Sequence, residues 1–366
     1  MISSVYIHIP FCKKICSYCD FCKVFYNKKM VKEYLKSLKN EINTKYKGEM
    51  ISTIYIGGGT PSSLDIKELK ELFKIIKIFK LDKTYEFTIE CNFDSITKEK
   101  LDLFKDNGVN RISFGLETIN KDVLKVLNRD LDLDYVKEII DYSNEIGLIN
   151  INLDLMYGFS FSNFDNLKKD LEFILSLDIK HISTYSLILE KNTLLDIKKY
   201  KSIDEDLDRE MYDYIHTTLK ENGFNHYEIS NFAKDGYESK HNLIYWHNEE
   251  YYGFGVGASS YYDDLRITSS RSITNYNKMI YNYEYEELTN NDKYIYEIIL
   301  GLRLKEGISL DNFKKKFGFS IRKNYNISRM VKEGKVVINN DYLKVPFNNW
   351  YVINTILLDF MEVNNE

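Results

Sequence analysis

The stretch "FCKKICSYCDFC" (residues 11–22) holds four of the five cysteines of this 366-residue chain. Cys12, Cys16, Cys19 and Cys22 are separated by gaps of three, two and two residues. In a reducing compartment, clustered cysteines bind metal or carry out redox chemistry more often than they form disulfides. A β-rich run, "VYIHIPF", precedes the cluster, so the sequence predicts a metal centre at the end of a first strand.

The composition limits the classes of protein to which this chain can belong. Hydrophobic residues make up 44% of the chain and charged residues 29%, enough for a sizeable core and unlike a disordered chain. The net charge of −5 argues against a dedicated nucleic-acid binder. No apolar run is long enough to span a bilayer, and the N-terminus lacks the basic region and cleavage site of a signal peptide. We therefore expect a cytoplasmic protein.

Strand and helix patterns alternate through the first half of the chain. Such alternation predicts a parallel sheet with crossover helices, either a barrel or an open doubly wound sheet with a crevice at its switch point. Polar and glycine residues sit mainly at strand ends, as at the site-bearing end of a barrel. We therefore predict an α/β fold, a partial (β/α)6 TIM-like barrel. The six strand patterns are "VYIHIPF", "STIYIGGG", "YEFTIEC", "RISFGLE", "ININLDLMYG" and "HISTYSLIL".

The alternation of strand and helix patterns ends after Leu189, which suggests that the chain has three parts. Residues 1–235 form the barrel, 236–288 an aromatic-rich connecting region, and 289–366 a small C-terminal domain. That last part shows three short helical patterns, a hairpin with an "INND" turn and a final helix. It resembles a winged-helix-like α+β module, which in a metabolic protein packs against its neighbour more often than it binds DNA.

The cysteine cluster permits four interpretations. A disulfide is the least favoured. A structural zinc site or a fully ligated [4Fe–4S] cluster would use all four thiolates, and the former would suit a DNA-binding regulator. In the fourth interpretation Cys12, Cys16 and Cys19 hold three irons of a cubane, and the fourth iron is open to a ligand.

"CKKICSYC" resembles the CxxxCxxC signature of radical S-adenosylmethionine (SAM) enzymes, including its place after a first strand. The resemblance implies that Cys12, Cys16 and Cys19 bind a [4Fe–4S] cluster. In that superfamily, SAM chelates the open iron of the cluster and is cleaved by one electron to methionine and a 5′-deoxyadenosyl radical. "YIGGGTPS" (residues 55–62) matches the glycine motif that contacts the SAM amino group in this superfamily, and it lacks the Lys and Ser/Thr of a phosphate-binding P-loop.

A closer resemblance is to the HemW family of haem chaperones, relatives of oxygen-independent coproporphyrinogen III oxidase. "IECN", "RISFGLE", "INLDLMYG", "HYEISNFA", "HNLIYW" and "YYGFGVGASSY" occur in the order seen in that family. The oxidase has a longer leader and a further cysteine two residues after the third, where this chain has Phe21. The resemblance therefore implies a haem chaperone, with the oxidase, which decarboxylates propionate side chains, as the alternative.

Matching the motifs assigns SAM contacts. Glu90 would bind the ribose or the amino group, Arg129 the carboxylate, Asp154 the ribose and Ile188 the adenine. Glu117 stands where these families usually have Gln. The full implied set of SAM contacts is Tyr6, Tyr18, Gly58, Gly59, Thr60, Glu90, Glu117, Arg129, Asp154 and Ile188.

The resemblance also implies haem contacts and partners. "HNLIYW" matches the HNxxYW motif that separates the chaperones from the oxidase, so His241, Tyr245 and Trp246 would contact haem, with His247 as a second candidate ligand. The expected partners are a haem-acceptor protein and an electron donor such as flavodoxin or ferredoxin, with peripheral membrane contact during delivery. Whether the chain turns over SAM or acts mainly as a chaperone stays open.

Some positions depart from the family pattern. Glu117 adds a negative charge beside SAM, no His follows Arg129, and Ser259 replaces a usual His. These changes reduce the imidazoles available for haem. Cys22 is an addition, and we interpret it as a non-ligand; Cys91 is predicted to be a small buried residue at a strand end.

Overall fold

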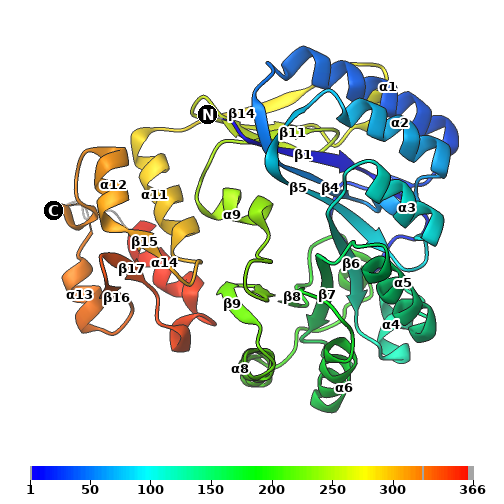
Figure 1. Ribbon diagram of the computed structural model, residues 1–366. Helices are drawn as coiled ribbons and strands as arrows, with labels where there is room; N and C mark the ends of the chain where they lie inside the picture. Colours follow the sequence, from blue (N-terminus) through cyan, green and yellow to red (C-terminus); the bar gives the residue numbers. More distant parts are fainter. Residues whose placement is uncertain (1, 324, 362–366) are drawn as a thin grey trace.

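The computed structural model describes residues 2–323 and 325–361, built around one nine-stranded sheet (Figure 1). All six predicted strands are present, and each pairs in parallel with the next. Their two outer members do not pair with each other, so the sheet stays open and the predicted partial barrel is confirmed. In sheet order the six are β1 (Ser4–Ile9), β4 (Met50–Gly58), β5 (Lys80–Asn92), β6 (Arg111–Glu117), β7 (Ile151–Tyr157) and β8 (His181–Ser186).

Helices cover the outer face of this sheet (Figure 1). Most begin at a residue whose side chain caps free backbone N–H groups; Asp65, for example, forms a reciprocal capping box with Glu68. Leu69, Leu72 and Phe73, which recur at helical spacing, are buried. The outer helices are α1 (Lys28–Lys45), α2 (Ile66–Ile76), α3 (Lys98–Asp106), α4 (Lys121–Leu127), α5 (Leu133–Glu145) and α6 (Phe164–Leu175).

Successive residues of a strand point to opposite faces of the sheet, and here the polar residues lie on the inner face. In β4, Ile54 and Ile56 belong to the apolar core, whereas Thr53 and Tyr55 make side-chain hydrogen bonds to polar groups of other elements. The register extends this inner row across the sheet. Partners in neighbouring strands include Tyr55 and Thr88, Glu90 and Ser113, Ser113 and Asn152, and Asp154 and Ser183.

Later parts of the chain extend both edges of the sheet. β11 (Tyr252–Phe254) pairs in parallel with β1, and β10 (Asn231–Ala233) pairs antiparallel with β8 and β9 (Asn225–Glu228). The segment predicted as a connecting region therefore contributes a strand to the barrel sheet. Two further helices precede these strands, α7 (Leu194–Ile197) and α8 (Glu205–Glu221).

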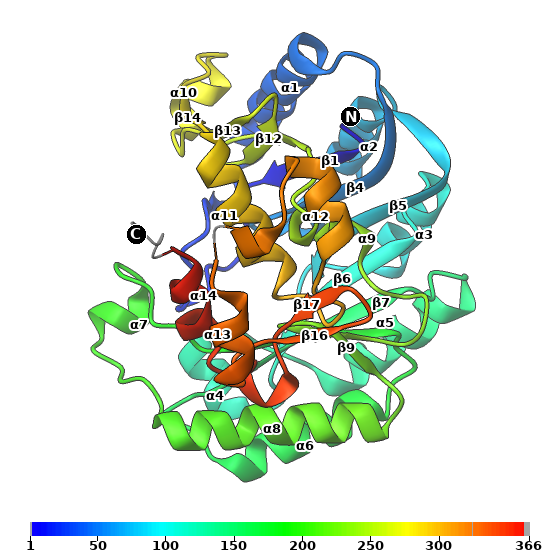
Figure 2. The same ribbon diagram turned by 90° about the vertical axis from the view of Figure 1, so that its left-hand side faces the viewer.

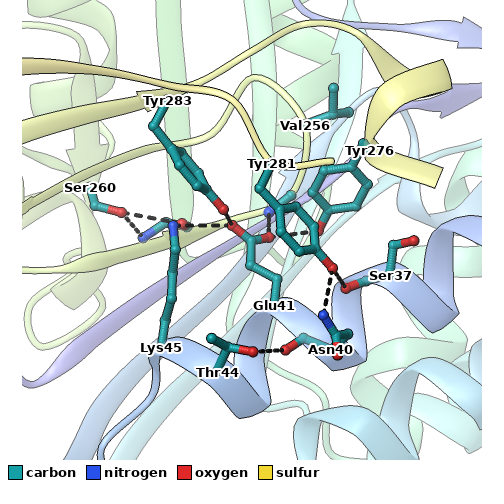
Figure 3. Close-up of polar contacts among 12 residues, drawn as sticks. Ser37, Asn40, Glu41, Thr44, Lys45, Val256, Ser260, Tyr276, Tyr281 and Tyr283 are labelled. Atoms are coloured by element: carbon teal, nitrogen blue, oxygen red, sulfur yellow. Dashed lines mark hydrogen bonds and ion pairs between the residues drawn. The ribbon is translucent and has the colours of Figure 1, made fainter. Parts of the chain in front are cut away.

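The buried carboxylate of Glu41 fastens the connecting region to α1 (Figure 3). It accepts hydrogen bonds from Gly255 N–H at 2.9 Å, Tyr276 O–H at 2.6 Å and Tyr283 O–H at 2.7 Å, and Lys45 Nζ lies 3.4 Å away. The fastened elements are a small sheet and a short helix: β12 (Ser259–Tyr262), β13 (Leu265–Ser269), β14 (Tyr283–Glu287) and α10 (Ile273–Asn277).

The C-terminal module has the predicted helices and hairpin. Asn340 and Asp341 both have positive φ (49° and 65°), as a two-residue type I′ turn requires. The module packs on α8 (Figure 2), where the ring of Phe347 stacks on His216 at 3.6 Å between centroids. Its elements are α11 (Asn290–Gly301), β15 (Ile308–Ser309), α12 (Leu310–Phe317), α13 (Ile327–Lys332), β16 (Val337–Asn339), β17 (Tyr342–Lys344) and α14 (Ile353–Met361).

Within residues 2–323 and 325–361, the helices are all too short or too polar to cross a membrane.

Candidate functional site

A cavity of about 420 Å³ opens where the parallel strands end. Residues from six strands and from the cysteine loop line it, in the place that barrels use for their sites. The structure brings most of the predicted site residues together here. Those that line the cavity are Cys12, Cys16, Tyr18, Cys19, Gly58, Gly59, Thr60, Glu90, Glu117, Arg129 and Asp154.

Two side chains point at sulfurs of the cysteine loop. Thr60 Oγ1 lies 3.6 Å from Cys12 Sγ, and Arg129 Nη1 lies 3.4 Å from Cys16 Sγ. Such donors stabilise thiolates, which are the form that binds iron. Burial raises the pKa of Cys12 to about 12 and also raises the pKa values of Cys16 and Cys19. Binding of a cationic metal centre would therefore displace protons from these thiols.

The loop starts at β2 (Phe11–Cys12) and ends at β3 (Val24–Phe25), two short strands that pair in parallel. Cys22 lies outside the cavity, against the backbone of Arg271 and beside Gly257. In the part of the chain that the structure describes, no three His, Cys, Asp or Glu side chains surround a single ion position. A cubane has a different requirement, because each thiolate takes a separate iron.

The three glycines at the end of β4, Gly57 to Gly59, allow close approach on three sides. A Cβ on Gly57 would come within 2.8 Å of the Glu90 carboxyl group, and one on Gly58 within 2.5 Å of the His8 ring. One on Gly59 would come within 2.7 Å of the backbone of Pro10. The glycine run therefore lets the cysteine loop and Glu90 pack against the end of β4.

Three carboxyl groups give the cavity an acidic side. Glu90 accepts hydrogen bonds from Tyr55 O–H at 2.8 Å and Gly58 N–H at 2.9 Å, and Asp154 accepts one from Asn152 at 2.8 Å. Burial raises the pKa of Glu90 to about 7 and raises the pKa values of Glu117 and Asp154. A ligand with positively charged groups would favour the ionised carboxylates.

Glu117 pairs with the one arginine that lines the cavity. Its Oε2 lies 2.9 Å from Arg129 Nη2, and its Oε1 accepts a hydrogen bond from Tyr18 O–H at 2.9 Å. Glu117 adopts a positive φ of 61°, at an irregularity in the pairing of β6 with β7. Arg129 also donates to the Gly115 carbonyl at 2.7 Å. The departure from Gln at position 117 thus places a carboxylate on the guanidinium expected to bind the SAM carboxylate.

Replacing Glu90 by glutamine tests the electrostatics of the cavity. In the folded protein the pKa of Glu90 is about 7, whereas its ordinary value is 4.5. Between these two pH values the folded state therefore binds more protons than the unfolded state. The free energy of unfolding contributed by Glu90 therefore falls as pH rises through this window. From about pH 5.5 to about pH 8, wild type should lose about 2 kcal/mol relative to Glu90→Gln.

Urea unfolding of both proteins, without cluster or SAM, measures this difference. Glu172→Gln, at an exposed glutamate, is the matched control and should follow wild type at every pH. A Glu90→Gln stability difference that does not vary with pH would mean that Glu90 titrates normally.

Two predicted SAM contacts lie elsewhere. Tyr6 does not line the cavity; it stacks on Tyr55 and hydrogen-bonds His8 Nδ1 at 3.0 Å, one layer beneath. Ile188 is 70% exposed and also lies outside the lining. The Tyr6 ring therefore helps to position Tyr55, and Tyr55 in turn donates a hydrogen bond to Glu90.

The HNxxYW motif lies on α9 (Lys240–Trp246), which packs against β4. The His241 ring is buried, and both of its nitrogens have partners: Nδ1 meets Ser4 and Thr53 hydroxyls at 3.0 and 2.9 Å, and Nε2 meets Tyr245 O–H at 2.7 Å. The ring also stacks on Tyr55 at 5.1 Å. His241 therefore supports the inner face of the barrel and offers no free nitrogen to a haem iron in this conformation. Tyr245 belongs to the same network, and Trp246 is partly buried.

Sequence reasoning missed several residues that line the cavity. Most of them lie within strands, where the alternation of polar and apolar residues was the available signal. Lys14 and Lys23 come from the cysteine loop and carry no such signal. The missed residues are Lys14, Phe21, Lys23, Tyr55, Cys91, Asn92, Ser113, Gly115, Ser183, Tyr185, Ser230 and Asn231.

Two families match this chain: residues 6–174 match the Radical SAM superfamily, and residues 288–351 match the HemN C-terminal domain. The chain is 38% identical to heme chaperone HemW of Lactococcus lactis, over 88% of this chain and 87% of that protein. It is 40% identical to heme chaperone HemW of Bacillus subtilis, over 87% and 88%. Coproporphyrinogen III oxidase (HemN) of Escherichia coli has a similar fold, with a TM-score of 0.86 at 20% identity, covering 98% of this chain and 90% of that one.

Proposed function

Because this chain belongs to the HemW family of radical SAM proteins, we propose that it is a haem chaperone that binds a [4Fe–4S] cluster, SAM and haem and delivers haem to an acceptor protein. The observation that carries the proposal is the cavity at the strand ends, which joins three cysteine thiols to a set of charged and polar groups.

Cys12, Cys16 and Cys19 fit the cluster. They share one cavity, Thr60 and Arg129 direct donors at two of the sulfurs, and Cys22 faces away. A cluster held by these three thiolates would supply the one-electron reduction of the SAM sulfonium. The chain's own residues hold the thiolates, position SAM and keep water from the reacting groups.

The charges of the cavity fit SAM. SAM carries an ammonium and a sulfonium, which suit Glu90, Glu117 and Asp154, and a carboxylate, which suits Arg129. Gly58, Gly59 and Thr60 allow close approach at the end of β4, and Tyr18 orients Glu117. Arg129 presents five donors, so it can contact Glu117 and the SAM carboxylate together.

A haem-acceptor protein and a one-electron donor such as flavodoxin or ferredoxin are the partners that this function needs. The likeness to coproporphyrinogen III oxidase is a likeness of fold at 20% identity and gives no separate support for oxidase activity. The oxidase alternative therefore serves as an outcome of the test.

The test uses anaerobically reconstituted protein with SAM and a reductant. We expect saturable binding of one haem per chain, with no consumption of coproporphyrinogen III supplied in a parallel reaction. Absorbance in the haem region and chromatography of the porphyrins measure these outcomes. Decarboxylation of coproporphyrinogen III, or haem binding that does not saturate, would contradict the chaperone function.

A further inference from the structure

The six histidines of the chain differ sharply in what their rings can still bind. Four are buried with both nitrogens engaged by protein groups, and a fifth, His216, meets His226 Nδ1 at 3.0 Å and stacks on Phe347. A ligand could therefore reach the ring nitrogens of these five histidines only by breaking their present contacts. The four buried rings are His8 (to Tyr6 and Cys22), His181 (to Asn152 and Tyr227), His226 (to His216 and Ile229) and His241 (to Ser4, Thr53 and Tyr245).

His247 is the exception. It is the last residue of the α9 turn, held by a backbone hydrogen bond to Leu243 at 2.8 Å, and its side chain is 39% exposed. Its Nε2 lies 3.7 Å from a carboxylate oxygen of Glu306, beyond hydrogen-bond length. This imidazole is therefore fixed at its backbone, and its Nε2 faces the Glu306 carboxylate at ion-pair distance without a hydrogen bond.

His247 lines a second cavity, of about 560 Å³, between the barrel and the C-terminal module. This volume lies within the range of cavities that bind small molecules and cofactors. Tyr227, Leu243 and Leu304 give it apolar surface, and Lys305 and Lys344 give it two cations from the C-terminal module. Asn225, Glu238 and Glu306 complete the lining.

We propose that haem binds in this second cavity, with His247 as the axial ligand and with Lys305 and Lys344 against the two propionates. Imidazole is a common axial ligand, and the two lysines match a ligand with two carboxylates. The inference rests on the proposed haem function and replaces His241 by His247 as the residue that meets iron.

The position separates haem from the chemistry of SAM. The two cavities share no lining residue, although Tyr227 lines the haem cavity and Ser230 and Asn231, a few residues later, line the other. Haem in the second cavity would therefore be bound apart from the residues that line the cavity of the cysteine loop. The short β9–β10 connection joins the linings of the two cavities.

The test titrates haemin into reconstituted full-length wild type, His247→Ala and the double variant Lys305→Gln/Lys344→Gln, followed by the Soret band. We expect His247→Ala to weaken binding by about tenfold or more and to lose the spectrum of an imidazole-ligated haem. Added imidazole should restore that spectrum. The double variant should weaken binding with the spectrum unchanged, and Lys332→Gln, at an exposed lysine outside the cavity, should behave as wild type.

The outcomes separate the inference from the function on which it rests. If wild type and His247→Ala bind haemin equally and with the same spectrum, the second cavity is not the haem site, while the chaperone function stands. If wild type itself shows no saturable binding, the chaperone function fails and the inference fails with it.

Discussion

Replacing Cys12, Cys16 and Cys19 together by alanine should leave a folded chain that retains no iron and no sulfide after anaerobic reconstitution. Wild type should retain about four of each per chain, with the broad visible absorption of a cubane cluster. The loss is complete because the protein supplies these three thiolates as ligands. Apart from the thiol of Cys91, which is buried, the other polar groups of the cavity are carboxylates, amides, hydroxyls and cationic side chains, which bind iron–sulfur clusters poorly.

Cys22→Ala is the matched control, because Cys22 belongs to the same loop but faces Gly257 and Arg271. It should keep the full iron and sulfide content. Loss of the cluster in Cys22→Ala would indicate a four-cysteine site, and a cluster that persists in the triple variant would refute the assignment. Iron and sulfide assays with circular dichroism distinguish loss of the cluster from loss of the fold.

Much of the barrel was predictable because local patterns specify it. Each strand of the parallel sheet is an apolar run next to a helix with its own capping residue, and the connection forces neighbours in sequence to be neighbours in the sheet. The "INND" turn was predictable for the same reason, since Asn340 and Asp341 tolerate the positive φ that the turn demands. Much of the site was predictable as well, because Glu90 and Glu117 stand at or near the ends of the neighbouring strands β5 and β6, and Asp154 lies within the next strand, β7.

The additions to the sheet were not predictable from local pattern. β11 is three residues long and joins β1 from about 250 residues later in the chain, so nothing near Tyr252 signals its partner. The same holds for His241, whose ring meets Ser4 and Thr53 across the inner face. A family motif indicates that such a residue matters, but only the packing shows whether its nitrogens are free.

The burial of Glu41 is predictable from its position on α1. On α1 the buried residues Val31, Tyr34, Leu35 and Leu38 mark one face, and Glu41 continues their spacing. A glutamate on the buried face of a helix needs partners, because an unpaired buried carboxylate is costly. The structure supplies them from the backbone of Gly255 and from Tyr276 and Tyr283 (Figure 3).

Glu41→Leu should therefore lower the free energy of unfolding by about 3–5 kcal/mol, since it leaves one backbone donor and two hydroxyls buried without an acceptor. The effect should reach the cysteine loop. Tyr34 O–H accepts from Val256 N–H at 3.2 Å and donates to the His8 carbonyl at 2.6 Å, and His8 Nε2 meets the Cys22 carbonyl at 2.7 Å. Loosening the segment around Gly255 should thus also loosen the end of that loop.

Urea unfolding measures the first effect, and amide hydrogen exchange at Gly255 and in β11 measures the second. Glu33→Leu, at an exposed glutamate of the same helix, is the matched control and should change the free energy of unfolding by less than about 0.5 kcal/mol. Glu41→Gln should fall between them, because its amide keeps one acceptor oxygen and loses the charge that binds Lys45. Equal stability of Glu41→Leu and Glu33→Leu would show that the buried carboxylate does not hold the connecting region on α1.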